Sequence, residues 1–290
     1  MYAYAIQSPP DSPAVNQADT AVSVFKPAAN KLPPRQQTIL ELARQGGFVA
    51  TEQLVRLFGV TPQTVRRDIN TLCEMKLLQR YHGGAGLPSS VENAPYADRQ
   101  IQGQDEKQRI GRLAAALIPN YASLFINIGT TTEAVAQALT QHEGLRVVTN
   151  NIKVAQILRA NSSFEVILAG GTVRNRDGGI IGDSAIEFMR GFRLDYAVIG
   201  ISGIDADGSL LDFDFGEVQV AKAIIENSRQ VLLTADKSKF GRRAMVRLGQ
   251  LRDVQALITS EAPPAAFLPA IKASGIDLIY DPVPAIPLQQ

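Results

Sequence analysis

The sequence predicts two domains, an N-terminal winged helix-turn-helix domain followed by a larger α/β domain with a mostly parallel sheet. The length of 290 residues suits two domains that each bury their own core. Apolar residues make up 45% of the chain, charged residues 20% and aromatic residues 6%, which is typical of a globular protein. From Asp105 onward, helical and strand-like patterns alternate, and this alternation favours the α/β class.

Several classes of protein are excluded by the composition. No run of about 18 apolar residues occurs, and the chain does not open with a basic segment followed by an apolar stretch. These patterns argue against a membrane span and a signal peptide, so we expect a cytoplasmic protein. Cys73 is the only cysteine, and His82 and His142 are the only histidines, so the spacing of zinc ligands is missing. We therefore expect neither a metal nor a cofactor.

The chain begins with residues 1–34, which contain six of the 16 prolines and show no sustained periodicity. This composition predicts a disordered leader, to which we assign no role. A mis-assigned translation start would produce the same pattern.

Residues 35–87 form the predicted winged helix-turn-helix domain. An apolar stripe indicates a first helix, which Gly46–Gly47 ends. Thr51 is expected to cap a second short helix that ends at Gly59. Three short helices are predicted in about 42 residues, as this fold requires.

The third predicted helix has two distinct faces. Thr61 is expected to cap it, with Pro62 at the first helical position, where a missing N–H costs nothing. Val65, Ile69 and Leu72 recur at spacings of four and three and form the inward stripe. The remaining arc, which we call the recognition face, consists of Gln63, Thr64, Arg66, Arg67 and Asn70.

The recognition face has suitable residue types for a DNA groove. Gln63 can pair with adenine, either arginine can bond to guanine or phosphate, and Thr64 can meet a thymine methyl or a phosphate oxygen. The same pattern also fits a small helical domain with a solvated basic face. Residues 35–82 hold seven Lys or Arg against four Asp or Glu, a net charge of +3, which weakly favours a polyanionic partner.

A predicted wing follows the third helix. Residues 77–82 read as a short strand that runs into a glycine turn and a return strand. Arg80 and His82 on this wing would lie along the DNA backbone. Thr51 and Thr61, at helix starts, are placed to offer backbone N–H groups to phosphates.

The rest of the chain divides into three parts. Residues 88–104 have the composition of a linker, residues 105–262 are the predicted α/β domain, and residues 263–290 are a C-terminal segment. The predicted helices and strand-like runs of the α/β domain are Glu106–Ile118, Ser123–Ile128, Glu133–Leu139, Arg146–Thr149, Phe164–Leu168, Tyr196–Ile199, Val231–Leu233 and Val254–Ile258.

One strand-turn-helix in the α/β domain has the chemistry of an anion site. Gly129, Thr130 and Thr131, which we call the anion turn, follow an apolar strand and open a helix. Backbone N–H groups and hydroxyls converge at such turns, so a phosphate would fit. Plain helix capping would produce the same pattern.

Further polar and glycine residues follow other predicted strands. Gly170 and Gly171, Gly182, and Asn150 each lie after such a strand, and Lys239 supplies a cation after another. Ligands of parallel sheets bind beyond the carboxyl ends of the strands, so these residues favour a small-molecule crevice.

The residues also carry a resemblance to a known family. The run from Val49 to Ile69, including Val60–Ile69 (VTPQTVRRDI), followed by Arg80–Ala85 (RYHGGA), resembles the signature of the DeoR family of bacterial transcriptional regulators. The resemblance extends over residues 35 to about 260, whereas the leader departs from it. It implies a repressor that binds operator DNA as a homo-oligomer, a dimer or tetramer, with a sensor domain similar to ribose-5-phosphate isomerase.

The resemblance also implies an effector. The segments LPSS, DGGIIG, AIIENSR and KFGR, with residues 199–211, are similar to those of family members that respond to glycerol-3-phosphate and control glycerol metabolism genes. This dianion would suit the anion turn with Lys239 or Lys222 nearby. Asn150, Asp205 or Asp212 could hold its hydroxyl groups.

Two other functions stay open at this point. One is a regulator, repressor or activator, of another sugar-phosphate pathway. The other is a sugar-phosphate isomerase with an accessory DNA-binding domain. The resemblance to the isomerase puts Ala221 where its proton-carrying acid would stand, which argues against catalysis. Glu217, one helical turn earlier, and the Asp205–Asp207 pair keep that alternative open.

Overall fold

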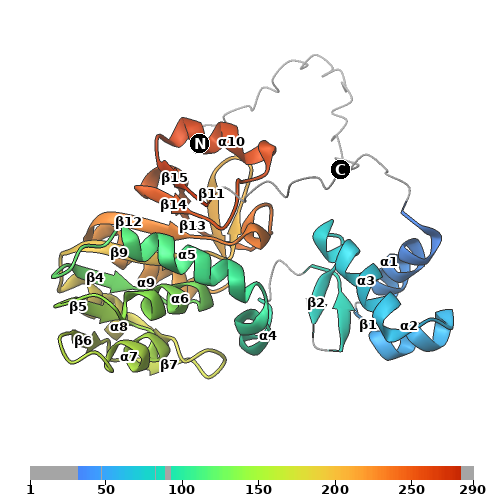
Figure 1. Cartoon of the computed structure of the whole chain (residues 1–290), viewed down its shortest axis with the longest axis horizontal. Helices are drawn as coiled ribbons and strands as arrows, with labels where there is room; N and C mark the ends of the chain where they lie inside the picture. Colours follow the sequence, from blue (N-terminus) through green and yellow to red (C-terminus); the bar gives the residue numbers. More distant parts are fainter. Residues whose placement is uncertain (1–31, 47, 82, 89–92, 282–290) are drawn as a thin grey trace, which may run out of the picture.

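The computed structural model describes residues 32–46, 48–81, 83–88 and 93–281. The leader predicted for residues 1–34 lies almost wholly outside these described residues. Among them, no helix is long and apolar enough to cross a membrane. Figure 1 shows a small N-terminal domain beside a larger α/β domain.

The small domain has three helices and a three-stranded antiparallel sheet in the order β1-β3-β2. β1 pairs with β3 and was not predicted from the sequence. Its elements are α1 (Pro34–Gly46), β1 (Phe48–Ala50), α2 (Thr51–Phe58), α3 (Pro62–Glu74), β2 (Gln79–Tyr81) and β3 (Gly84–Gly86).

The core of the small domain follows the predicted inward stripe. Val65, Ile69 and Leu72 on α3 are fully buried, with Leu54 of α2 and Ile39 of α1 beside them. Burying each such side chain contributes about 1.5–3 kcal/mol, so this stripe fixes which face of α3 remains outside.

The predicted helix ends of the small domain agree with the structure except at Thr51, and α1 ends at Gly46 as expected. Gly59 ends α2 in the left-handed conformation at φ 62°, which a residue with a Cβ rarely adopts. Thr61 caps α3, and Pro62 takes its first position. The predicted cap at Thr51 is wrong, because Ala50 is the N-cap residue of α2 and Thr51 is already helical.

The α/β domain is built on a seven-stranded parallel sheet in the order β15-β14-β12-β9-β4-β5-β6, which confirms the predicted fold class. Its elements are α4 (Tyr96–Ile101), α5 (Gln104–Ala116), β4 (Ser123–Ile126), α6 (Thr130–Leu139), β5 (Arg146–Thr149), α7 (Ile152–Leu158), β6 (Glu165–Leu168), β7 (Thr172–Val173), β8 (Ile180–Ile181), α8 (Asp183–Arg190), β9 (Leu194–Gly200), β10 (Gly203–Ile204), β11 (Ser209–Asp212), α9 (Phe215–Glu226), β12 (Ser228–Thr234), β13 (Val246–Gln250), β14 (Ala256–Ile258), α10 (Leu268–Ser274) and β15 (Asp277–Ile279).

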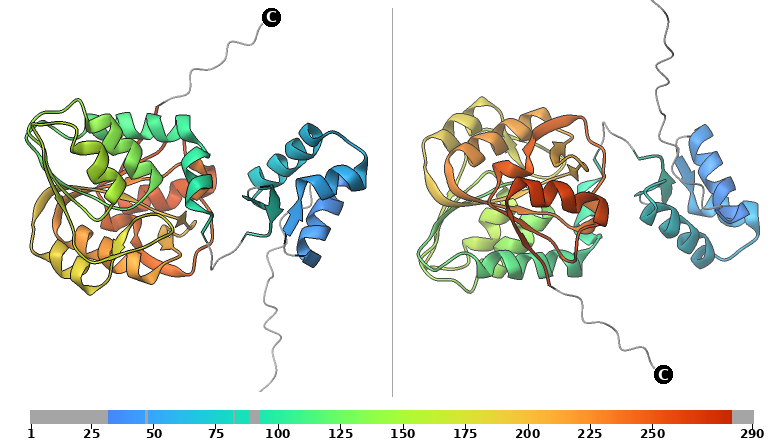
Figure 2. Two further views of the ribbon diagram at one scale, coloured as in Figure 1. Left: turned by 90° about the horizontal axis from the view of Figure 1, so that it is seen from below. Right: turned by 90° about the horizontal axis from the view of Figure 1, so that it is seen from above.

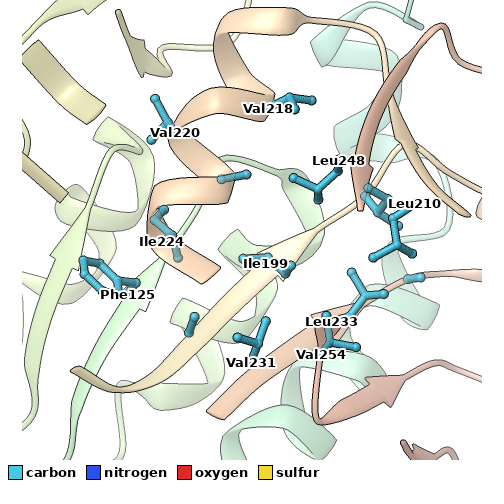
Figure 3. Close-up of a cluster of buried hydrophobic side chains, with 14 of the residues drawn as sticks. Phe125, Ile199, Leu210, Val218, Val220, Ile224, Val231, Leu233, Leu248 and Val254 are labelled. Atoms are coloured by element: carbon cyan, nitrogen blue, oxygen red, sulfur yellow. The ribbon is translucent and has the colours of Figure 1, made fainter. Parts of the chain in front are cut away.

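Helices cover both faces of this sheet (Figure 2). α5, α6 and α7 pack on one face around Leu124 and Val147, and α8 and α9 pack on the other around Phe125 and Val148. Neighbouring residues of one strand therefore serve opposite cores, as the period of two requires. Figure 3 shows the second core, where Ile224 of α9 lies above the sheet.

Several elements depart from the predicted ones. The strand predicted over Ser123–Ile128 ends at Ile126, so the turn before α6 is longer. α4 lies inside the predicted linker, and the C-terminal segment adds α10 and β15 to the α/β domain. β10, β11 and β13 form a separate antiparallel sheet. β10, β11, β13 and β15 have only two to five residues each, too few alternations for a periodic signal, and this explains why the sequence did not reveal them.

Candidate functional site

The recognition face is the first candidate site. Its members are exposed, except that Thr64 is half-buried. Thr61 Oγ1 accepts the backbone N–H of Thr64 at 3.2 Å, and the two hydroxyl oxygens lie 2.9 Å apart. These contacts hold the start of α3, while the two arginines on the face stay accessible to a polyanion.

Thr51 is placed differently from the prediction. Its backbone N–H donates to the carbonyl oxygen of Gly83 at 2.8 Å. This bond ties the start of α2 to the wing, so that N–H is already used and does not face a phosphate. Thr51 therefore has a structural role, because it joins α2 to the wing.

An ion pair between half-exposed Arg35 and buried Asp68 joins α1 to α3, and sequence reasoning missed it. Asp68 is 6% exposed and accepts hydrogen bonds from Arg35 Nε at 2.5 Å and Gln36 Nε2 at 3.0 Å. Burial acts to raise the pKa of Asp68, but these bonds outweigh burial and hold that pKa below its ordinary value. An aspartate within an apolar stripe was the available signal.

On the wing, Arg80 donates a hydrogen bond to Asn70 Oδ1 and so joins β2 to the recognition face. Both side chains are exposed, and together they extend the polar surface of α3. The amide oxygen of Asn70 is engaged by this contact. His82, the other predicted wing residue, lies outside the described residues.

The second candidate site is a pocket at the carboxyl ends of β4 and β9, where the anion turn lies, and we call it the sensor pocket. These two strands are neighbours in the sheet (Figure 1). The pocket is lined by Asn93, Arg99, Ile128, Gly129, Thr130, Thr131, Gly200, Ile201, Ser202, Asp212, Glu217 and Lys239.

The anion turn has the geometry of a helix start that can receive an anion. Gly129 has φ 151°, a conformation that disfavours any side chain, and α6 begins at Thr130. The hydroxyl of buried Thr132 donates to the carbonyl oxygens of Asn127 and Gly129, at 2.7 and 2.8 Å. Thr132 therefore braces the turn from behind, and the first N–H groups of α6 are left for a ligand.

Cations gather around the anion turn. Lys239 is half-buried in the 3₁₀ turn after β12, and its Nζ lies 3.7 Å from Asp236 Oδ2. Burial lowers the pKa of Lys239 although Asp236 opposes that effect. Arg99 lines the same pocket from α4, and the Arg242 guanidinium stacks 4.8 Å from the Phe213 ring centre.

Two carboxyl groups also line the pocket, those of buried Asp212 and half-buried Glu217. Asp212 accepts hydrogen bonds from Ser202 Oγ at 3.1 Å and from the Phe213 N–H at 2.6 Å. Burial raises the pKa of Asp212 despite these bonds. Burial, with the charge of Asp212, raises the pKa of Glu217 to about 7, although Arg174 lies 2.7 Å away. An ionised carboxylate accepts hydrogen bonds from ligand hydroxyl groups, and a protonated one can also donate one.

Comparison with known proteins identifies the family. The DeoR-like helix-turn-helix domain matches residues 35–91, and the DeoR C terminal sensor domain matches residues 102–261. The chain belongs to the DeoR family. This match confirms the predicted family. The protein is thus a DNA-binding transcriptional repressor with an effector-binding sensor domain, and not an enzyme. Ala221, 3% exposed, packs in the core of this sensor domain.

Relatives match nearly the whole described chain. The glycerol-3-phosphate regulon repressor of Escherichia coli (strain K12) is 52% identical, over 84% of this chain and 97% of that protein. The repressor of the same name from Haemophilus influenzae is 56% identical, over 79% and 89%. The transcriptional repressor CsqR of Escherichia coli is 43% identical, over 85% and 94%.

Among solved structures, ribose 5 phosphate isomerase A from Neisseria gonorrhoeae is similar over 47% of this chain and 54% of its own, with 18% identity and a TM-score of 0.35. A likeness this distant has no bearing on function. The α/β assignment of the DeoR sensor domain stands on its own strand order.

The structure brings five of the predicted effector residues together in the sensor pocket, namely the three of the anion turn, Asp212 and Lys239. The predicted glycines lie elsewhere. Gly170, Gly171 and Gly182 are exposed and frame the β7–β8 hairpin and the start of α8. Asn150 is fully buried, and its side chain donates to the carbonyl oxygen of Ile180 at 3.1 Å, which pins that hairpin.

Asp205 and Lys222 also lie outside the lining of the sensor pocket. Asp205 forms the β10–β11 turn, where its backbone N–H donates to the carbonyl oxygen of Ser209 at 2.9 Å. Lys222 lies in the middle of α9, more than one turn after Glu217. The antiparallel sheet carries Asp205 away from the carboxyl ends of the parallel strands, which the sequence could not show.

Three polar pocket residues of the sensor were missed. Ser202 follows β9 directly, and the glycines around it were the available signal. Asn93 and Arg99 lie in the segment predicted as a linker, and no periodicity there indicated contact with the pocket.

Proposed function

We propose that this DeoR-family protein represses genes of glycerol and glycerol-3-phosphate metabolism, and that glycerol-3-phosphate releases it from its operator. The identity of 52–56% to glycerol-3-phosphate regulon repressors supports this function. The observation that carries the effector proposal is the convergence of a helix start, Lys239 and Arg99 in one pocket.

The pocket has separate partners for the two ends of this effector. The phosphate would sit at the anion turn, where first-turn N–H groups, hydroxyls and the two cations all favour a negative charge. The glycerol hydroxyls would face Ser202 and Asp212, which already share a hydrogen bond of 3.1 Å.

On the DNA side, the recognition face would enter the major groove, with Gln63, Arg66 or Arg67 at base edges and Thr64 or Asn70 beside them. Arg80 would lie along the backbone with the wing. The proposal includes a dimer or tetramer, since paired heads match repeated half-sites. A repressor works where the DNA is, so it also includes a cytoplasmic location.

A titration of the operator complex tests this function. The DNA fragment is selected by the full chain from a random library, and the complex is titrated with glycerol-3-phosphate and a panel of sugar phosphates. We expect glycerol-3-phosphate to release the DNA at the lowest concentration. Release by a different sugar phosphate alone would assign the protein to another pathway, and tighter DNA binding with ligand would contradict release as its mode of action.

A further inference from the structure

The connecting segment, residues 93–102, joins the two domains and is held to the sensor domain by polar contacts. Its helix α4 has no buried residue, and Ile101 is 77% exposed. Ala94, 7% exposed, is the one buried apolar side chain of the segment, so its position depends mainly on polar contacts. We expect a segment with so few buried apolar contacts to open at a lower free energy than the core helices.

Polar contacts join this segment to the sensor domain, and two of its residues line the sensor pocket. The hydroxyl of Tyr96 donates to both carboxylate oxygens of Glu133 on α6, at 2.8 and 2.9 Å. Asn93 accepts a hydrogen bond from Arg242 at 2.9 Å. Asn93 and Arg99 both line the pocket together with the anion turn. Figure 1 shows α4 on the side of the sensor domain that faces the small domain.

Arg99 has a weaker ionic partner than a ligand phosphate would be. Its Nη2 lies 3.5 Å from Asp177 Oδ2, whereas Arg174 Nη2 lies 2.7 Å from the same oxygen. Asp177 thus keeps a closer partner if Arg99 turns toward an anion. The side chain of Arg99 is 16% exposed, so solvent and salt screen such a pair only partly.

We propose that Arg99 is the residue through which the effector acts on the DNA-binding domain. The bound phosphate pairs with Arg99 and fixes the connecting segment against the sensor domain, in a position that does not fit two correctly spaced DNA-binding heads. Effector and operator are then coupled because Arg99 reaches the effector in only one position of the segment. This proposal rests on the proposed function, since it uses the same pocket.

Two variants of the full chain separate this role from simple binding. Arg99→Gln removes a pocket cation carried by the connecting segment, and Lys239→Gln removes one carried by the sensor domain. For each, calorimetry gives the affinity for glycerol-3-phosphate without DNA. A DNA-binding titration gives the coupling ratio, which is the operator Kd at saturating effector divided by the Kd without effector.

We expect both variants to bind the effector about tenfold more weakly. Only Arg99→Gln should also lower the coupling ratio, by about fivefold or more, because Lys239 contacts the effector in either position of the segment. Equal coupling ratios in wild type and Arg99→Gln, or an unchanged effector affinity in Arg99→Gln, would overturn the proposal. Thr130→Val takes the place of Lys239→Gln if that variant does not fold.

Failure of the proposed function gives a different result. In that case glycerol-3-phosphate leaves the wild-type operator complex intact. The coupling ratio is then measured with the sugar phosphate from the panel that does release the wild type, and the same comparison of the two variants decides the role of Arg99.

Discussion

The recognition face and the sensor pocket differ in how far their charged groups are exposed to solvent. Arg66 and Arg67 are exposed on α3. DNA phosphates that pair with them would release their condensed counterions. In the pocket, Asp212 is buried and Lys239 and Glu217 are half-buried, and the pKa values of all three are shifted mainly by burial. Operator binding should therefore weaken steeply with salt, whereas effector binding should change less.

The largest expected effect is a loss of stability that is confined to the small domain. Leu72→Ala removes a fully buried side chain and should destabilise the small domain by about 2–5 kcal/mol. Urea unfolding of the full chain should show an early transition with loss of operator binding, while calorimetry still detects the effector. Leu57→Ala, at a side chain 56% exposed on α2, is the control and should change stability little. A single transition that shifts as a whole would show that the domains unfold together.

A smaller effect is expected on the recognition face. Arg67→Ala should cost about 1–3 kcal/mol of operator affinity if this guanidinium reads a base, measured by competition between operator and random DNA. If it contacts only phosphate, affinity for all sequences should fall alike and the salt slope should drop by about one. Arg44→Ala on α1 serves as the control. Unchanged DNA binding in Arg67→Ala would remove this residue from the interface.

The connecting segment offers a local test with a close control. Tyr96→Phe deletes the hydrogen bond to Glu133 and should weaken the docking of α4 by about 1 kcal/mol, which is about a fivefold faster amide exchange. Tyr121→Phe deletes a similar bond, from Tyr121 to Glu143 at 3.2 Å, between two loops of the sensor domain. Hydrogen exchange of residues 96–102 should respond only to the first change, and an equal response would contradict the described docking.

The smallest effect should be confined to the pocket. Thr130→Val keeps the shape of the anion turn and deletes one hydroxyl, so effector affinity should fall by about 0.5–1 kcal/mol. Operator affinity without effector should stay at the wild-type value. Thr140→Val, at the other end of α6, is the control for calorimetry. Equal effector affinity in Thr130→Val and wild type would place the phosphate elsewhere.

The two regions also differ in how far the sequence predicts them. The inward stripe of α3 and the cap at Thr61 follow from local spacing, and the structure confirms both. The anion turn is likewise a local pattern, and it lies in the pocket.

The rest of the pocket depends on strand order, which local patterns do not contain. β9 lies beside β4 although β5 to β8 come between them in the chain, and this pairing brings Ser202 to the anion turn. Asn93 and Arg99 enter the pocket from a segment with no periodic signal. Asp205 was misplaced because its hairpin leaves the parallel sheet.

The last strand of the sheet sets a practical limit on how the sensor domain can be shortened. β15 pairs with β14 along Ala256–Ile258, and all three of these residues are buried. A protein truncated at residue 262, where the sequence pattern ends, would leave β14 as an unpaired apolar edge strand. Such an edge can pair with strands of other molecules. Preparations meant for calorimetry or crystallisation should therefore retain the chain through Ile279.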